Sequence, residues 1–395
     1  MSLKKIHFLS ELLQKHNIPS TYKTLRYEFN DKLFFEADNV AEQNIYVDTL
    51  CLVCFAFNCF LKPTFNNSRF KTIKITQQTH VSLSIIIPPN TTHIKQYLTA
   101  HFSKSSRAPI IKKMKRLESC FNIKYKVFYG SIQKKEYKQL MDKVHEMLVN
   151  RFKQRNNSNY ILNDWNTYFE LFFPLINEKK ASIFVIYNKD TPIQISINFH
   201  FKKTFFAHIP AYDIDYAQFG LGNTAIYKQL EWCIENNYEF LDMGNGELDY
   251  KKRWCNYRYL LETHIFYKRN SLKASIIAYK ELNIIKIKNF IKIIIKSAVY
   301  KKLKQEMLTK KNLKFPEYTI ENLNETEIPK ANNLELVDLK TNPFFKDIKK
   351  PLFNFIYNTK DHFDAIKIYK IKNKTHSFLI LGTKKNMVIN FNKNK

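Results

Sequence analysis

Glycine, cysteine and arginine are all scarce in this chain of 395 residues. Its six cysteines argue against a disulfide-rich secreted domain. Cys51, Cys54 and Cys59 lie in one apolar run without a second pair at metal-ligand spacing, so we read them as buried strand thiols and expect no metal. No run approaches the ~20 apolar residues of a membrane span. Glu11 and Gln14 interrupt the N-terminal apolar stretch, which predicts an amphipathic helix rather than a signal peptide and a soluble, cytoplasmic protein.

The chain is rich in hydrophobic residues (45%) and in aromatic residues (15%), enough for a large core and two or three domains. Its net charge of +29 comes from 55 Lys and only 9 Arg. Arginine is the side chain that binds phosphate in a bidentate fashion, and the lysine excess accompanies abundant Asn, Ile, Phe and Tyr. A genome-wide codon bias favours the same residues and can supply much of this charge, so we favour a solvated lysine coat; a nucleic-acid partner is the alternative.

Periodicity predicts an α/β (α+β) fold with a mixed, mostly antiparallel sheet. Residues 33–129 predict mainly strands, at 33–35, 45–60, 70–76, 81–87 and 123–129, with the basic segment 111–117 before the last of them. Apolar residues at spacings of three and four then predict two helices, followed by a three-strand meander, a third helix and a parallel strand reached by a crossover. In order, these elements cover residues 133–154, 163–175, 182–187, 193–201, 205–209, 220–237 and 239–242.

Two segments near the C-terminus differ in composition from the rest. Residues 280–304 predict a basic helix, although part of the run alternates like a strand. For the lysine-rich segment 270–310 we favour a helix packed on its own domain with lysines outward; a peripheral membrane contact is the alternative. The last 85 residues predict a linker followed by a small unit with a helix at 344–357 and a hairpin at 366–381.

Four of the six glycines lie between positions 220 and 246, in two clusters. The first, Gly220-Leu221-Gly222-Asn223-Thr224, opens a predicted helix. The N-terminus of a helix exposes unpaired N–H groups and the positive end of its dipole, which suits a pyrophosphate or a carboxylate. We expect Asn223 or Thr224 to cap this helix; a simple tight turn is the alternative.

The second cluster, Asp242 to Trp254, follows a strand and contains three carboxylates, a phenol and three cations. Ligands bind at the carboxyl ends of strands in open α/β sheets, and mixed charge there can hold a base beside anion-binding groups. An ordinary charged surface loop is the alternative.

Together these motifs resemble the GNAT-fold acyltransferases of the CelD and Fem-related group, over about residues 105–267 and most specifically at 242–251. The resemblance implies a tandem GNAT-like fold, with a degenerate half at 1–115 and a GNAT domain at 116–268. The basic helical segment at 269–310 and the small C-terminal α+β unit at 311–395, predicted from composition, complete the domain organisation. The resemblance also implies that Gly220 and Gly222 match the loop that binds the pyrophosphate of coenzyme A. Ala217 stands where the family has Gln or Arg, which puts the donor in question.

By this resemblance, the predicted donor site comprises Gly220, Leu221, Gly222, Asn223 and Thr224, and the donor is acetyl-CoA or another acyl-CoA. For catalysis we predict Glu247 as base and Tyr250 as acid, with His208 as an alternative base and Asp242 as a further motif residue. A packed core or rim histidine is the alternative reading of His208. Predicted substrate contacts are Tyr212, Asp213, Gly246, Lys251 and Arg253.

The sequence therefore predicts an N-acyltransferase for a small-molecule amine, an amino sugar or amino acid derivative of envelope polysaccharide or lipid assembly. A Fem-like enzyme that uses aminoacyl-tRNA is one alternative, consistent with the positive charge. A non-catalytic GNAT scaffold that binds anionic membrane or polyanion through residues 270–310 is another.

Overall fold

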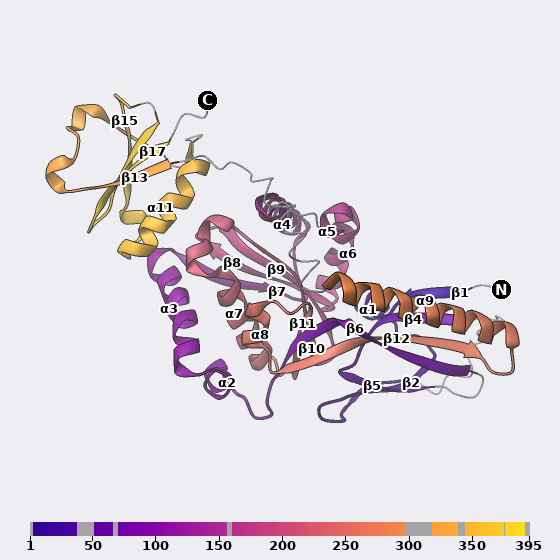
Figure 1. Cartoon of the computed structure of the whole chain (residues 1–395). Helices are drawn as coiled ribbons and strands as arrows, with labels where there is room; N and C mark the ends of the chain where they lie inside the picture. The colour runs from indigo at the N-terminus through magenta and orange to yellow at the C-terminus, as the bar shows by residue number, and fades with distance from the viewer. Residues whose placement is uncertain are drawn as a thin grey trace.

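A nine-stranded mixed sheet forms the centre of the computed structural model, which describes residues 3–37, 51–65, 70–155, 160–296, 318–338, 344–374 and 376–391 (Figure 1). Two strand pairs are parallel, β1 with β4 and β10 with β11, and the others are antiparallel, as predicted. In spatial order the strands are β1 (Leu3–His7), β4 (Cys51–Asn58), β12 (Tyr257–Lys268), β6 (Phe70–Ile86), β11 (Phe240–Asn245), β10 (Thr204–Tyr212), β9 (Thr191–Phe201), β8 (Ala181–Asn188) and β7 (Ile123–Phe128).

Helices cover both faces of this sheet. On one face the core includes α1 (Phe8–Gln14), α4 (Lys134–Gln154), α5 (Tyr160–Asn163) and α6 (Trp165–Asn177). On the other face pack α2 (Ile94–His101), α3 (Lys104–Cys120), the 3-10 turn η1 (Ile214–Phe219), α7 (Leu221–Glu235) and α8 (Asp249–Trp254). Because both faces are covered, strand β8 is apolar on each: Ile183 and Val185 join one core, Phe184 and Ile186 the other.

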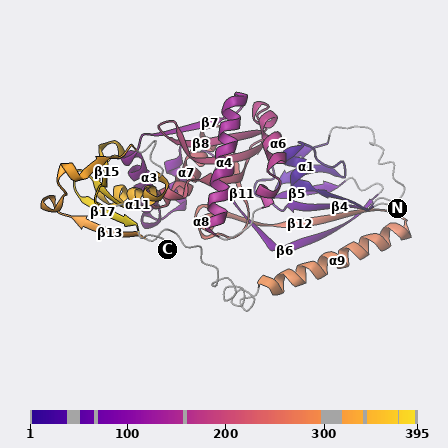
Figure 2. The same ribbon diagram turned by 90° about the horizontal axis from the view of Figure 1, so that it is seen from above.

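Three further elements complete the described chain. A small sheet holds β3 (Leu33–Glu36), β2 (Tyr22–Tyr27) and β5 (Leu61–Phe65). Helix α9 (Leu272–Lys296) runs along the outside of β12 and β6 (Figure 2). The C-terminal unit is an antiparallel sheet of β13 (Tyr318–Leu323), β17 (Asn386–Phe391), β16 (Ser377–Leu381), β15 (Lys367–Ile371) and β14 (Leu334–Leu336), with α11 (Phe345–Thr359) and three 3-10 turns (Glu325–Glu327, Ala331–Asn333, Phe363–Ala365).

The predicted helices and strands between 133 and 242 are confirmed within a few residues, as is the helical assignment of 280–296; residues 297–304 lie outside the described residues. The N-terminal segment was predicted wholly helical, but residues 3–7 pair with β4 and α1 starts only at Phe8. Segments 70–76 and 81–87 were predicted as two strands but form one strand, β6, which pairs with β12 along most of its length. The expected strand at 45–60 is seen as β4, with residues 45–50 outside the described residues.

Within 33–129, the structure has two helices, α2 and α3, that the sequence did not predict as such. The basic segment 111–117 belongs to α3, whose buried residues Ile110, Met114 and Leu117 recur at helical spacing. The C-terminal helix and hairpin were predicted correctly as α11 and β15–β16, but the flanking strands β13, β14 and β17 were missed.

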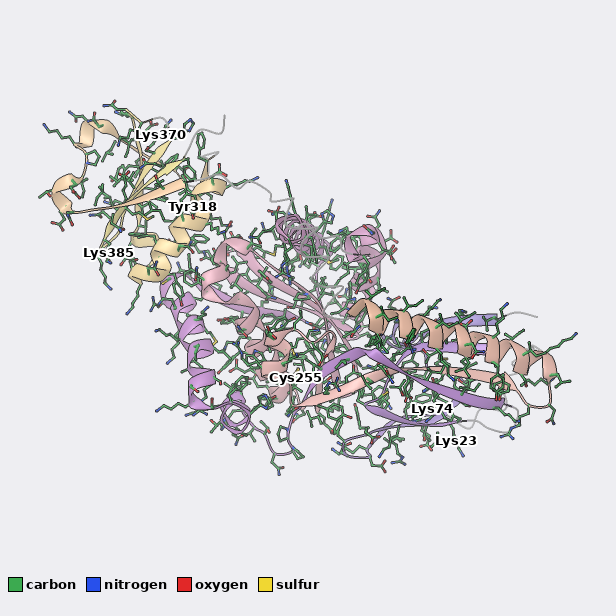
Figure 3. The ribbon with its side chains drawn as sticks, viewed as in Figure 1. Lys23, Lys74, Cys255, Tyr318, Lys370 and Lys385 are labelled. Carbon is green, nitrogen blue, oxygen red and sulfur yellow. The ribbon has the colours of Figure 1, made fainter. Side chains whose placement is uncertain are left out.

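Exposed lysines occur in every part of the described chain. Exposed Lys23 and Lys74 lie on the part of the molecule that contains the N-terminal half, and Lys385 lies on the C-terminal unit (Figure 3). This distribution agrees with a general lysine coat.

Candidate functional site

The two parallel strands β10 and β11 separate at their carboxyl ends. Their register covers only three pairs, the last of which joins Phe206 to Asp242. A bulge between Ala207 and Ile209 turns β10 away at that point, while β11 continues to Asn245, which pairs with β6. Beyond Phe206 and Asp242 the strands β10 and β11 are therefore no longer paired with each other. We call this gap the wedge.

A cavity of about 680 Å³ opens at the wedge. Strand β10 lines it with Phe206, Ala207 and His208, and strand β11 with Asp242, Gly244 and Asn245. The opposite walls come from α1, β4, β12, α5, α6 and α9. The cavity thus connects the carboxyl ends of two central strands with the N-terminal half of the chain, a position typical of ligand sites.

His208 lies at the bulge of β10, inside an aromatic cage. Its ring centroid is 5.0 Å from that of Phe199 and 5.8 Å from that of Tyr168. Its Nε2 is buried and has no hydrogen-bond partner among the described residues. Burial lowers the pKa of His208 to about 4, so the imidazole is neutral at pH 7 and Nε2 can accept a proton from a group in the cavity.

Asp242 is a buried carboxylate on the other side of the wedge. Its Oδ1 accepts hydrogen bonds from the Ser84 hydroxyl at 2.8 Å, the Tyr259 hydroxyl at 3.0 Å and the Gly244 amide at 3.1 Å. No described residue donates to its Oδ2, and the residue lines the cavity. Burial raises the pKa of Asp242, and its hydrogen bonds and Lys251 partly oppose that rise. One oxygen is thus fixed, and the other is left for a ligand.

Lys251 holds the end of β11 in place. Its buried ammonium donates to the carbonyl oxygens of Met243 at 2.7 Å and Asn245 at 2.9 Å, with a longer contact of 3.4 Å to Gly244. These three acceptors use its three N–H donors. In this structure the Lys251 ammonium is thus occupied within the protein, and the substrate contact predicted for it would require these bonds to break.

The first glycine cluster does open a helix, α7, as predicted. Gly220 is its N-cap residue and has a left-handed backbone with φ of 69°, so neither Asn223 nor Thr224 caps the helix as we expected. The first bonds of α7 run from the amides of Asn223 and Thr224 to the Gly220 carbonyl. The amides of Leu221 and Gly222 precede them, where a helix leaves N–H groups for an outside acceptor.

Space around this helix start differs between the two glycines. A Cβ built at Gly220 would meet Lys113 of α3 at 3.1 Å, whereas one at Gly222 would meet nothing within 4 Å. The fold therefore places no steric demand for glycine at 222. The Asn223 side chain faces inward, where its Oδ1 accepts a 2.9 Å bond from the indole of buried Trp254 in α8. This bond joins the two glycine-bearing segments.

Glu247, the predicted base, lies outside the cavity. Its side chain is exposed and 3.5 Å from the Arg258 guanidinium, so the described structure does not bring it to the wedge. Arg253 is exposed as well. Gly246 donates its amide to the Val81 carbonyl at 2.9 Å, so it extends the contact of the β11 end with β6.

Tyr250, the predicted acid, lies near Arg151 and Tyr212. The Arg151 guanidinium lies 4.7 Å from the Tyr212 ring centroid and donates to the Pro210 carbonyl at 3.1 Å, while its Nε is buried without a partner among the described residues. Burial raises the pKa of Tyr250, and Arg151 opposes the rise. The phenol is thus protonated at pH 7.

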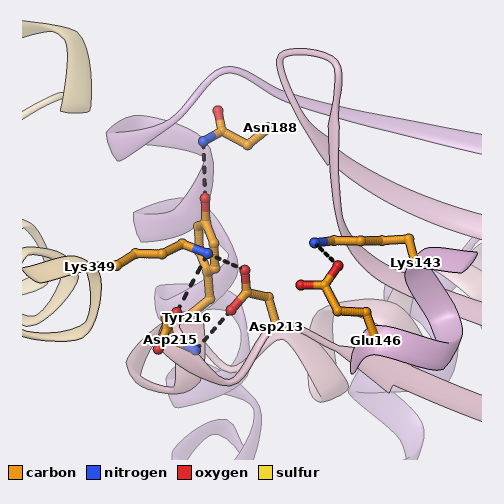
Figure 4. Close-up of polar contacts among 7 residues, drawn as sticks. All are labelled: Lys143, Glu146, Asn188, Asp213, Asp215, Tyr216 and Lys349. Atoms are coloured by element: carbon orange, nitrogen blue, oxygen red, sulfur yellow. Dashed lines mark hydrogen bonds and ion pairs between the residues drawn. The ribbon is translucent and has the colours of Figure 1, made fainter. Parts of the chain in front are cut away.

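Asp213 is occupied by contacts with the C-terminal unit. Lys349 of α11 contacts Asp213 at 2.5 Å and Asp215 at 3.5 Å, and Asp213 also accepts from the Asp215 amide (Figure 4). The rings of Tyr216 and Phe353, 4.4 Å apart, pack beside these ion pairs. The substrate contact predicted for Asp213 is replaced here by a docking contact.

Sequence reasoning missed the cavity walls that come from distant segments. Lys5, His7 and His80 come from the N-terminal half, and Lys288 and Lys292 from α9. His80, the nearest of the N-terminal residues along the chain, precedes Phe206 by 126 positions, so no local pattern in the sequence could join these residues to the wedge.

Comparisons with known proteins assign part of the chain to a family. A family model described as an acetyltransferase (GNAT) domain matches residues 104–252, which run from α3 into α8 and include β10, β11 and both glycine clusters. No curated protein matches the chain.

Three solved structures illustrate a distant likeness. They are a conserved protein of unknown function from Bacteroides thetaiotaomicron (11% identity, 56% of this chain and 70% of that one, TM-score 0.35), FemX (11%, 47% and 61%, TM-score 0.35) and a GCN5-related N-acetyltransferase from Sphaerobacter thermophilus (7%, 54% and 59%, TM-score 0.27). This chain spans less than two thirds of the last two.

Proposed function

The chain carries a GNAT acetyltransferase domain at residues 104–252, and from this we propose that it transfers an acyl group from acyl-CoA to an amine. The observation that carries the proposal is the cavity at the wedge, which His208 and Asp242 both line from two parallel strands that have just separated. The acceptor we propose is an amino sugar or an amino acid derivative of envelope polysaccharide or lipid assembly.

The donor fits the wedge by its chemistry. The amides of Leu221 and Gly222 at the start of α7 suit a pyrophosphate, and Lys113 lies beside them. The unpaired backbone edges of β10 and β11 suit the extended, amide-containing arm of acyl-CoA, which can pair with them as a strand does. The thioester would then reach the cavity between His208 and Asp242.

In the reaction, the acceptor nitrogen attacks the thioester carbonyl carbon and the carbon–sulfur bond breaks. We assign proton removal from the amine to Nε2 of His208, which is neutral and without a competing partner. Asp242 Oδ2 orients the amine. Backbone N–H groups at the β10 bulge stabilise the oxyanion, and the protonated Tyr250 phenol supplies the proton for the thiolate. This assignment prefers His208 over Glu247, because Glu247 lies on the surface.

The charged residues in the walls of the cavity indicate which kind of acceptor would fit. Lys5 is neutralised by Glu281, but Lys288 and Lys292 have no ion-pair partner among the described residues. Two free cations at the rim favour an acceptor with a phosphate or a carboxylate, as amino sugar nucleotides and amino acids have. Residues 1–115, proposed as the second GNAT-like half, supply the opposite wall.

Calorimetric titration with acetyl-CoA and longer acyl-CoAs tests the donor. Gly222→Ala is the informative variant, because its methyl enters space that the fold leaves open. We expect Gly222→Ala to weaken acyl-CoA binding at least tenfold and to leave the thermal unfolding curve unchanged. Gly382→Ala, in the distant C-terminal unit, should leave acyl-CoA binding unchanged, provided that circular dichroism shows it folded. Absence of binding by the folded wild type to every acyl-CoA would refute the proposal.

Aminoacyl-tRNA is the second candidate donor, and one observation favours it. Helix α3 lines an open groove with five cations, Lys104, Arg107, Lys112, Lys115 and Arg116. Such a surface attracts a nucleic-acid backbone. If tRNA is the donor, its affinity falls steeply with salt and Lys112→Gln with Lys115→Gln weakens it; tRNA binding that is absent or independent of salt eliminates this candidate.

A further inference from the structure

Helix α9 has a packed face and an outward face. The packed face holds Ala274, Ala278, Glu281 and Ile285, all buried, at spacings of four, three and four. It covers β12, β6 and β4, and Glu281 pairs with Lys5 of β1. These contacts fix the rotation of the helix, so the residues half a turn away point to solvent.

The outward face is apolar. Leu272, Ile276, Ile287 and Phe290 are 84%, 67%, 59% and 64% exposed, and Tyr279 and Ile294 are also exposed. Their spacings of four, three, eight, three and four place all six on one side of the helix. They form two groups, 272–279 and 287–294, on one side of a 25-residue helix, with exposed Asn283 between them. This clustering differs from scattered surface hydrophobics. We call these six residues the outer stripe.

Lysines border the outer stripe. Lys273, Lys280 and Lys286 are exposed and lie at its two edges, and the only acidic residue of α9 is the buried, paired Glu281. The exposed surface of the helix is thus apolar in the middle and positive at the edges. Apolar side chains flanked by lysines fit the boundary of an anionic bilayer, where acyl chains meet phosphate headgroups.

We propose that α9 binds the enzyme to an anionic lipid surface through the outer stripe. No described helix is long and apolar enough to cross a membrane, and the lysines of α9 along its length fit a helix that lies in the plane of the surface. Figure 2 shows α9 on the outside of the sheet, with no described element over it.

The binding pose has a consequence for the cavity. Lys288, Asn289 and Lys292 of the same helix line the cavity wall. A helix that lies in the headgroup layer therefore places one wall of the cavity at the membrane surface. An acceptor anchored in that membrane would reach the wedge without leaving it.

Co-sedimentation of the full chain with vesicles tests the proposal. Wild-type protein should pellet with phosphatidylcholine vesicles that contain 30% phosphatidylglycerol, and much less with pure phosphatidylcholine or at 0.5 M salt. We expect Ile276→Asn, Ile287→Asn and Phe290→Asn together to lower the partition coefficient at least tenfold. Lys273→Gln, Lys280→Gln and Lys286→Gln together should lower it on anionic vesicles only.

Two matched controls keep the test decisive. Ile320→Asn with Leu336→Asn removes exposed apolar residues of the C-terminal unit, and Lys134→Gln, Lys135→Gln and Lys138→Gln removes three exposed lysines of α4. Both should bind vesicles as the wild type does, and circular dichroism should show all variants folded.

Equal pelleting by the wild type and the apolar α9 variant would overturn the proposal, as would no pelleting of the wild type on anionic vesicles. Light scattering gives the remaining outcome. A wild-type dimer that the apolar α9 variant converts to monomer, without vesicle binding by either, would make the outer stripe a contact between two copies and also overturn the proposal.

Discussion

Lys251→Met should loosen the end of β11 without disturbing the helix that carries it. Methionine keeps the apolar stem of the side chain but leaves the carbonyls of Met243 and Asn245 without their 2.7 and 2.9 Å donors. Hydrogen bonds to a charged group contribute about 1.5–3 kcal/mol each, so two give about 3–6 kcal/mol. The 3.4 Å contact to Gly244 adds little.

Part of that sum is offset, because burial of the ammonium is unfavourable, as its lowered pKa indicates. If half is offset, about 2 kcal/mol remains, which is roughly a 30-fold change in the equilibrium for local opening. Hydrogen exchange measured by mass spectrometry in peptides that cover 240–254 reports this opening.

The matched control is Lys252→Met, on the same helix turn but exposed. Exchange in this segment should speed up about 30-fold in Lys251→Met and less than twofold in Lys252→Met. Equal exchange in the wild type and Lys251→Met would refute the positioning role given to Lys251 and restore it as a free cation for a ligand.

Two further predictions concern His208 and Asn223. The folded-state pKa of His208 is about 4, below its ordinary value of 6.5, so the native state binds fewer protons than the unfolded state between pH 4 and 6.5. The free energy of unfolding should therefore decrease as the pH falls from 6.5 to 4. His208→Gln should lack this part of the pH dependence. With an acceptor amine that does not titrate in this range, the rate should show no inflection near pH 6.5. His208→Gln should lower kcat about 10²–10⁴-fold and leave the affinity for acyl-CoA unchanged. An inflection near pH 6.5, or an unchanged kcat in this variant, would exclude His208 as the base. Asn223→Ala leaves the indole N–H of buried Trp254 unpaired, so the free energy of unfolding in urea should fall by about 1–3 kcal/mol. The same substitution should cost less in a Trp254→Phe background. Equal losses in both backgrounds would mean that the bond does not couple the two segments.

Much of the fold could be predicted from local patterns. The helix at 134–154 and the strands around 181–212 repeat at 3.6 and 2 residues over long stretches, and the crossover from β10 to β11 follows from strand, helix and strand in sequence. The N-terminal segment could not be predicted, because its seven-residue helix is preceded by a strand fixed only by its partner β4. β6 is continuous for the same reason, since β12 pairs along it.

The predicted site residues lie in different surroundings in the structure, and their roles stay predictions. The two glycine clusters marked α7 and the β11 end, where the wedge lies. Glu247 and Lys251 drew attention as charges in a motif, yet one is on the surface and the other is bound by three carbonyls. His208 became a candidate for the base because the residue lines the cavity at the bulge of β10 and its buried Nε2 has no hydrogen-bond partner among the described residues. Burial, which sequence does not give, decided between them.

The central claim is that acyl-CoA lies in the wedge, from the start of α7 to the cavity. Hydrogen exchange with and without saturating acetyl-CoA tests it most directly. We expect slower exchange in peptides that cover 207–213, 219–225 and 243–247, and no change in β13–β17. Saturable binding that protects none of these three segments, or only the basic face of α3, would contradict it.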